Sequence, residues 1–278
     1  MSLQPVSTTS KNARLAGIIW GPAKTGKTTF AATLPGKKLI INFDPDGYLS
    51  IMHRTDVDFI DLAELPAKDA INEAKKAADF IVSEEGEQYG SVILDSLTTL
   101  TETSLRDAID RGIGRSAGFT PSIDAPGIAG YGARNSTTND VLSRILRATG
   151  RAGKNVFFIA HADDPIQNEV GQAIQQTIML ASKIRNLATL KVSEIYYIDT
   201  GTGGKRTLYL APFGIKSPMG SRIFDTAACP KFELKYTIDE DDETQPDTLA
   251  NIINTWRENG YKKLTSRPTE ISKVATKD

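Results

Sequence analysis

Eight residues near the start of the chain form a pattern suited to wrapping phosphate groups. The pattern is Gly-x-x-x-x-Gly-Lys-Thr, from Gly21 to Thr28. Gly21 and Gly26 let the backbone curl so that successive N–H groups point inward at phosphate oxygens. Lys27 would neutralise the β and γ phosphates of a nucleoside triphosphate, and Thr28 would offer a hydroxyl to Mg²⁺. We therefore expect the triphosphate to be held by Gly21, Pro22, Ala23, Lys24, Thr25, Gly26, Lys27, Thr28 and Thr29.

A carboxylate further along the chain can hold the metal ion. The apolar run 91–94 ends at Asp95. Such a run is typical of a central parallel strand, whose carboxyl end faces the crevice where ligands bind. We expect Asp95 and Thr28 to be the Mg²⁺ ligands, with Asp95 acting directly or through water.

Strands and helices have to alternate for these residues to meet. Apolar runs predict buried strands at 15–20, 38–43, 58–62, 91–95 and 155–160. Apolar periodicity and capping residues predict helices at 28–34, from Pro66 onward, and at 99–110, 141–149, 178–190 and 248–258. Two later runs, 194–199 and 206–211, look like antiparallel strands joined by a glycine-rich turn. The order predicts an α/β fold with a mainly parallel central sheet flanked by helices.

The segment 111–135 has a composition that does not predict a packed helix or strand. Residues 111–135 carry six glycines and two prolines, so we expect an irregular segment that is functional or mobile. A second stretch, 163–176, is polar and precedes the helix at 178–190.

Composition limits the classes of function. The 278 residues are 40% hydrophobic, which suffices for one α/β core with appendages, and the formal net charge of −1 does not mark a nucleic-acid or membrane binder. A single cysteine, Cys229, excludes internal disulfides, and with only His53 and His161 beside it a structural zinc site is not expected. No apolar stretch approaches the ~20 residues that span a bilayer. We expect a soluble, cytoplasmic protein.

Taken together, four segments resemble the RecA-type ATPase core in order and spacing. They are Gly-Pro-Ala-Lys-Thr-Gly-Lys-Thr-Thr at 21–29, Asn-Phe-Asp-Pro-Asp-Gly at 42–47, Val-Ile-Leu-Asp-Ser-Leu at 92–97 and Phe-Ile-Ala-His at 158–161. More narrowly, the chain is similar to the short RecA-core ATPases encoded by bacteriophages, which are linked to single-strand annealing and recombination. The resemblance covers about residues 14–225. We expect an extension at 1–13, a RecA-like P-loop NTPase domain at 14–237, an acidic linker at 238–247, and a terminal helix and tail at 248–278.

The resemblance implies catalytic roles beside Lys27 and Asp95. The acid after the second strand, which polarises the attacking water in this family, best matches Asp46, with Asp44 as the second choice. His161 stands where the family senses the γ-phosphate of ATP. The alternatives are a plain Asp-Pro-Asp-Gly turn and a structural histidine at a strand end.

The resemblance also implies contacts to single-stranded DNA. The first DNA loop of the family corresponds to the glycine-rich segment, where Arg111, Arg115 and Arg134 would follow phosphates. Phe119 or Tyr131 could stack on a base. The second loop corresponds to a group of amide side chains: Gln167, Asn168, Gln172, Gln175 and Gln176. An irregular surface loop with solvated arginines is the alternative.

Finally, the resemblance implies a homo-oligomer, which would be a ring or a filament. Lys216 and Arg222 follow the late strands, where RecA-type proteins present basic residues to the ATP of a neighbouring subunit. A plain surface turn is the alternative. The acidic run 239–243 is either a solvated linker or a flap that competes with DNA. A P-loop kinase of a small molecule, or an ATPase that never binds DNA, remains the alternative function.

Overall fold

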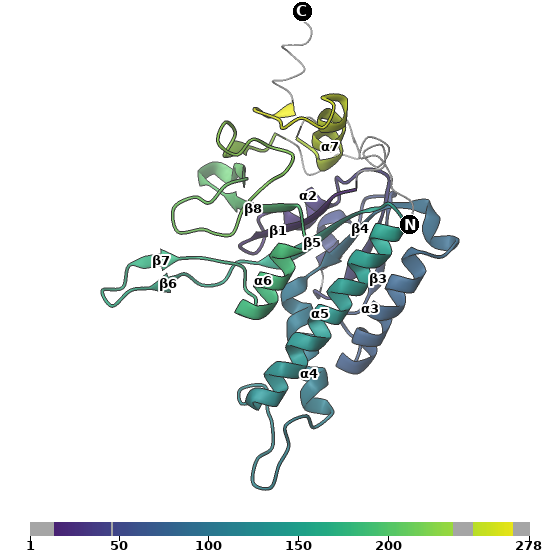
Figure 1. Cartoon of the computed structure of the whole chain (residues 1–278), viewed down its shortest axis with the longest axis vertical. Coiled ribbons are helices and arrows are strands. Elements are labelled where there is room, and N and C mark those ends of the chain that lie inside the picture. The colour runs from purple at the N-terminus through teal and green to yellow at the C-terminus, as the bar shows by residue number, and fades with distance from the viewer. Residues whose placement is uncertain (1–13, 46, 236–246, 269–278) are drawn as a thin grey trace, which may run out of the picture.

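The computed structural model describes residues 14–45, 47–235 and 247–268. Its main feature is an eight-stranded sheet with the order β10-β9-β8-β1-β5-β4-β2-β3 (Figure 1). The strands are β1 (Ala16–Gly21), β2 (Lys37–Asn42), β3 (Val57–Asp61), β4 (Tyr89–Asp95), β5 (Asn155–His161), β8 (Glu194–Thr200), β9 (Arg206–Tyr209) and β10 (Lys231–Glu233).

Six neighbouring strands, from β3 to β8, run parallel, and β9 and β10 continue the sheet antiparallel. Strand β5 lies between β1, which leads into the phosphate loop, and β4, which ends at Asp95. The predicted α/β fold with late antiparallel strands is confirmed. The additional strand β10 is too short and polar to stand out in the sequence.

Six α-helices of the described chain cover or flank the sheet. They are α2 (Lys27–Ala31), α3 (Ala67–Ile81), α4 (Leu97–Asp110), α5 (Gly127–Arg151), α6 (Ser182–Leu190) and α7 (Leu249–Glu258), with short 3₁₀ turns η2 (Gly47–Ile51), η3 (Glu85–Gln88) and η4 (Thr202–Gly204) between elements. Of the α-helices, α3, α4, α5 and α6 pack on one face of the sheet, while α2 and α7 pack on the other.

Alternation along the strands divides the core in two. In β1, Ile18 and Trp20 face the layer of α3 to α6, while Ile19 faces α2 and α7. Side chains of a strand point alternately to opposite faces, so a strand buried on both sides needs an unbroken apolar run. This requirement explains why the strands were predictable from short apolar runs.

The glycine-rich segment is more regular than its composition indicates. Helix α5 begins at Gly127, directly after Pro126, so residues 127–135 are helical and only 111–126 form a loop between α4 and α5. A proline just before a helix is compatible with its start, and packing of α5 against α3, α4 and α6 outweighs the low helix propensity of glycine. The expected irregular segment 111–135 is therefore wrong in its second part.

The region before α6 differs from expectation in two ways. The helix expected at 178–190 begins only at Ser182, because Ile178 forms a bridge to Ala162 instead. The polar stretch before it is a hairpin of β6 (Ile166–Gln167) and β7 (Ala173–Gln175), which projects from the body of the molecule (Figure 1).

Within the described ranges, no helix combines the length and apolar character needed to cross a bilayer. The acidic run 239–243 lies outside the described residues, as do the segments 1–13 and 269–278.

Candidate active site

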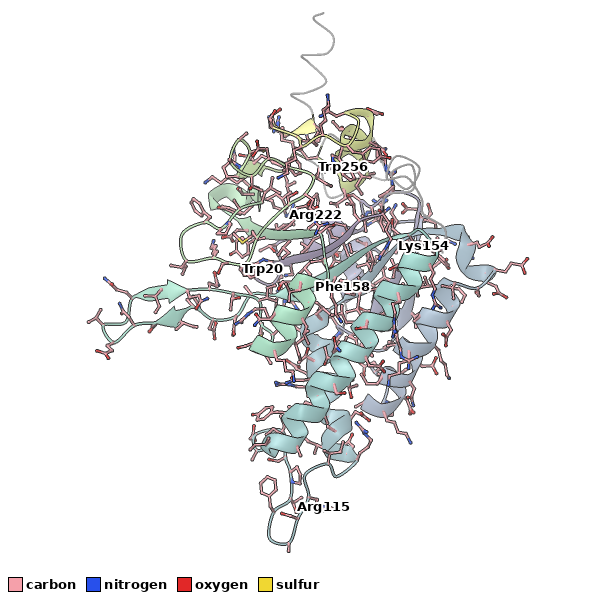
Figure 2. The ribbon with its side chains drawn as sticks, viewed as in Figure 1. Trp20, Arg115, Lys154, Phe158, Arg222 and Trp256 are labelled. Atoms are coloured by element: carbon pink, nitrogen blue, oxygen red, sulfur yellow. The ribbon has the colours of Figure 1, made fainter. Side chains whose placement is uncertain are left out.

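The carboxyl ends of four neighbouring strands bring the candidate residues to one edge of the sheet. Strand β1 ends at Gly21, opposite His161 at the end of β5, and β2 ends opposite Asp95 at the end of β4. Parallel strands share this edge, which explains how residues more than 100 positions apart meet. The side chains of Trp20 and Phe158 lie just behind this edge, in the buried interior (Figure 2).

The phosphate loop is shaped around its lysine. Lys27 is only 5% exposed, and its Nζ donates a hydrogen bond to the carbonyl oxygen of Pro22 at 2.6 Å. Burial lowers the pKa of Lys27 to about 8, although the carboxylates of Asp95 and Asp44 act to raise it. A buried ammonium group held by a single neutral carbonyl is poised to exchange that partner for an anion.

Two glycines make the loop possible. Gly26 has a φ of 85°, and a Cβ there would lie 2.7 Å from Nε of Arg206. At Gly21 a Cβ would lie 2.1 Å from the carbonyl oxygen of Ile198 in β8. The same Arg206 donates from Nε to the carbonyl oxygen of Thr25 at 3.1 Å, so β9 braces the outer side of the loop.

Thr28 and Asp95 form the second part of the site. Thr28 Oγ1 donates to Asp95 Oδ2 at 2.6 Å, and Asp95 is 2% exposed. Burial raises the pKa of Asp95 to about 6, against the hydrogen bond from Thr28, which lowers it. These hydroxyl and carboxylate oxygens match the preference of Mg²⁺, which commonly takes one or two carboxylates and completes its shell with phosphates and water. The described residues offer no cluster of three or more acidic, histidine or cysteine ligands.

Asp44 connects the remaining candidates. Its Oδ2 lies 3.1 Å from Nε2 of His161, and its Oδ1 accepts hydrogen bonds from Ser96 at 3.0 Å and from Thr99. Burial acts to raise the pKa of Asp44, but the hydrogen bonds from His161, Thr99 and Ser96 outweigh it, so the pKa is lowered and Asp44 stays ionised at neutral pH. Asp46, the first choice for the water-polarising acid, lies outside the described residues.

A family model described as an AAA domain matches residues 13–213. The chain belongs to the AAA domain family. It is thus a P-loop ATPase-type domain, and the family implies that it binds a nucleotide. A search of curated proteins found no match.

Two of the DNA candidates of this AAA domain, Arg111 and Arg115, lie beyond the far end of α4. Helix α4 starts next to Asp95 and has 14 residues, so its end lies ~21 Å away. Arg111 follows α4 and pairs with Asp107 at 2.8 Å, while Arg115 is exposed on the projecting loop (Figure 2). Arg134 lies in helix α5 rather than in a loop, with its guanidinium 4.8 Å from the ring centre of Tyr131.

The amide side chains of the second candidate loop belong to the β6–β7 hairpin. Asn168 closes the hairpin turn, because its Oδ1 accepts from the backbone N–H groups of Val170 and Gln172. Gln176 sits at the hairpin base and donates from Nε2 to the carbonyl oxygen of Asp163 at 3.2 Å. Gln167 and Gln175 are exposed.

The two candidate fingers lie at opposite ends of β8 and beyond the matched residues 13–213. Lys216 Nζ bonds to Asp199 Oδ2 at 2.6 Å, near the carboxyl end of β8. Arg222 is exposed, and its backbone N–H donates to Glu194 at the amino end of β8. Five residues of a strand span ~16 Å, so the structure does not bring the two cations together.

The sequence interpretation missed Ser96, Thr99 and Arg206 as parts of the site. Ser96 caps α4, and a serine directly after the strand acid was a recognisable start signal for that helix. No local signal marks Arg206, because only the pairing of β9 with β8 carries it to the phosphate loop.

Proposed function

We propose that this AAA domain is a Mg²⁺-dependent, RecA-like ATPase that acts on single-stranded DNA in phage-type recombination or annealing, and that it assembles as a ring or filament. The observation that carries the proposal is the hydrogen-bonded set at the carboxyl edge of the sheet. Thr28 and Asp95 form one half of it, and Asp44 and His161 form the other.

Each member of the set has a chemical task in this proposal. Lys27 would leave the Pro22 carbonyl and bind the β and γ phosphates. Thr28 and Asp95 would hold Mg²⁺, which when bound neutralises charge on the phosphates. Asp46 or Asp44 would orient the attacking water. Asp44 keeps acceptor capacity for this task, because a carboxylate has about four lone-pair sites and three of them are used.

Helix α4 supports the link from ATP to DNA. Its cap, Ser96, contacts Asp44, and its far end leads into the loop that carries Arg115. His161 offers a hydrogen bond that a γ-phosphate could accept and that hydrolysis would remove. A change at the phosphate would therefore reach the DNA loop through one rigid element.

A direct test is ATP hydrolysis with and without single-stranded DNA, at several Mg²⁺ concentrations. We expect no turnover without Mg²⁺ and faster turnover with single-stranded DNA than with duplex DNA. If hydrolysis depends on Mg²⁺ but its rate is the same with and without any DNA, the DNA part of the proposal is wrong. A P-loop kinase or a DNA-independent ATPase would then be the remaining function. No hydrolysis under any condition would contradict the ATPase part.

A further inference from the structure

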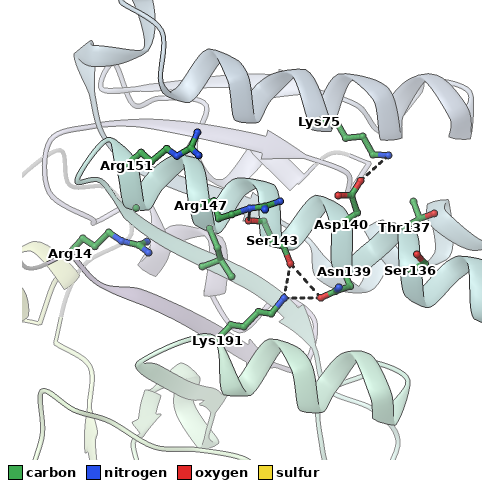
Figure 3. A pocket seen from close by; sticks show the side chains of 12 residues that line it. Arg14, Lys75, Ser136, Thr137, Asn139, Asp140, Ser143, Arg147, Arg151 and Lys191 are labelled. Carbon is green, nitrogen blue, oxygen red and sulfur yellow. Dashed lines mark hydrogen bonds and ion pairs between the residues drawn. The ribbon is translucent and has the colours of Figure 1, made fainter. Parts of the chain in front are cut away.

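A basic groove lies on the side of the sheet that is covered by α3 to α6. It is bordered by α3, α5 and the end of α6 (Figure 3). Its volume is about 1010 Å³. Five cationic side chains line it: Arg14, Lys75, Arg147, Arg151 and Lys191. The other lining residues are mainly hydroxyl and amide side chains of α5, and no aromatic residue is among them.

The positive charge of this groove is largely unbalanced. Asp140 is the acid of its lining, and it already pairs with Lys75 at 3.1 Å and with Arg144 at 3.0 Å. Within the described part of the chain, the other four cations form no ion pair with a carboxylate. They are Arg14, Arg147, Arg151 and Lys191.

Neutral groups hold three of these cations in place instead, and for Arg147 the group is the carbonyl oxygen of Ser143, which accepts from its Nε at 3.2 Å. Lys191 Nζ donates to Ser143 Oγ at 2.6 Å and to Asn139 Oδ1 at 2.8 Å, and Arg14 donates to Thr149 Oγ1 at 3.2 Å. Burial, and then the positive charge of Arg147, lower the pKa of Lys191. Arg14, Arg147 and Lys191 are thus held without being neutralised, as a site for an anion requires.

The shape of the groove favours a long anion over a compact one. Its lining on α5 extends from Ser136 to Arg151, which is ~22 Å along the helix axis. Ser143, Arg147 and Arg151 repeat every four residues, so they lie along one face of α5. Their spread exceeds the size of a single phosphate group.

We propose that this groove binds the phosphodiester backbone of a nucleic-acid strand without reading its bases. Arginine, lysine, serine, threonine and asparagine side chains are the usual partners of that backbone. Base stacking needs aromatic rings, which the lining does not offer. The proposal extends the DNA part of the proposed function to a second surface, since α5 also carries Tyr131 and Arg134 near its start.

The groove is separate from the nucleotide site. Arg14 and Lys191 come just before β1 and β8, so the end of the groove that they line lies at the amino edge of the sheet. The phosphate loop lies at the carboxyl edge, ~20 Å from that end of the groove along the six residues of β1. Nucleotide binding therefore serves as an independent check that groove variants are folded and intact.

The test compares two double variants of the full chain. Arg147→Glu/Arg151→Glu alters the groove, and Lys68→Glu/Lys263→Glu alters two exposed lysines elsewhere. Each reversal lowers the formal net charge by two, so both variants go from −1 to −5. Binding of a labelled 30-nucleotide single strand is measured by fluorescence anisotropy at several salt concentrations, without ATP.

We expect the groove variant to bind the strand at least tenfold more weakly, with a salt slope shallower by about 0.7 for each phosphate that it no longer binds. The control variant should bind within twofold of the wild type, and both variants should bind ATP normally. Equal weakening in both variants, or unchanged binding and slope in the groove variant, would overturn the proposal. A competition experiment gives a further outcome that would overturn the proposal. If tripolyphosphate displaces the labelled strand as well as unlabelled strand does, at the same concentration of phosphate groups, the groove holds a small phosphorylated ligand instead.

A third variant separates this inference from the proposed loop. In Arg111→Glu/Arg115→Glu/Arg134→Glu the groove is intact. If this loop variant binds normally and the groove variant does not, the proposed loop fails and the groove stands. If only the loop variant loses binding, the groove proposal fails and the loop stands. If the wild-type chain binds no nucleic acid, both the loop proposal and the groove proposal are wrong. The ATPase part of the proposed function is still tested by the hydrolysis assay.

Discussion

At the scale of single residues, the main feature of the site is that the buried Lys27 side chain has a single hydrogen-bond acceptor among the described residues. Its ammonium group is buried and held by one carbonyl oxygen, that of Pro22. Lys24 lies three residues earlier in the same loop but is exposed. Both residues can be truncated to alanine without touching the glycines that shape the loop, so the pair separates charge at the phosphates from loop structure.

We expect Lys27→Ala to lower ATP hydrolysis by roughly 10²-fold or more and to weaken triphosphate binding, because the charge opposite the transferring phosphate is removed. Lys24→Ala should keep most of both properties. Steady-state hydrolysis and binding of a fluorescent triphosphate measure the two effects. Near wild-type turnover by Lys27→Ala would place the nucleotide site elsewhere.

His161 lies between the nucleotide edge and the base of the β6–β7 hairpin. Its ring bonds to Asp44, while its backbone carbonyl accepts from the N–H of Met179 behind the β6–β7 hairpin. We expect His161→Ala to keep nucleotide affinity within about threefold but to lose stimulation by single-stranded DNA. His161→Gln should recover part of the stimulation, because an amide can also donate to Asp44.

A DNA titration of the hydrolysis rate measures this effect. His53→Ala is the matched control, since His53 is the other histidine and is exposed. Unchanged stimulation in His161→Ala would leave His161 with a structural role.

At the scale of elements, strands were more predictable than helices. A buried parallel strand needs a short apolar run, and 91–94 before Asp95 supplied both its place and its functional end. The start of α5 was not predictable, since Gly127, Gly130 and Gly132 disfavour a helix that only its neighbours stabilise. The pairing of Asp44 with His161 was equally hidden, because it depends on strand order, which short apolar runs do not encode.

Strand β2 carries a charged group that must be compensated inside the protein. Lys38 is fully buried and bonds to Asp56, which Arg54 also contacts at 2.7 Å. Burial acts to raise the pKa of Asp56, but hydrogen bonds from Arg54 and Lys38 outweigh it, so its folded pKa lies below the usual 3.8. Its contribution to stability is therefore present above pH ~4 and is lost as the pH falls through the folded pKa.

We expect Asp56→Asn to lower the free energy of unfolding by about 2 kcal/mol at pH 7, because a buried cation loses a charged partner. The difference from the wild type should shrink as the pH approaches 3. Urea unfolding at several pH values measures it. Asp58→Asn, in an exposed pair with Lys37, should cost under about 1 kcal/mol. A difference for Asp56→Asn that grows in acid would contradict the assigned sign.

At the scale of the whole molecule, the question is whether one chain completes its own site. Lys216 is held by Asp199 and lies 4.5 Å from the ring centre of Tyr197, whereas Arg222 lies at the opposite edge of the sheet. In a ring or filament, either could reach the ATP of a neighbour.

Mixed assemblies test this arrangement. Lys27→Ala subunits keep both cations, and Lys216→Ala/Arg222→Ala subunits keep the phosphate loop. We expect mixtures to recover hydrolysis that neither variant shows alone, and the two single variants then identify which cation acts. A fully active double variant, or a wild type that hydrolyses ATP as a monomer, would contradict a shared site.

The length of α4 has a mechanical consequence. Its first turn is anchored by Ser96 and Thr99 on Asp44, and its other end is joined to a surface loop. A rod ~21 Å long that tilts by ~5° at one end moves its other end by ~2 Å. In the proposed function the helix would therefore act as a lever arm, which converts the making or breaking of a hydrogen bond at Asp44 into a displacement of the loop at its far end.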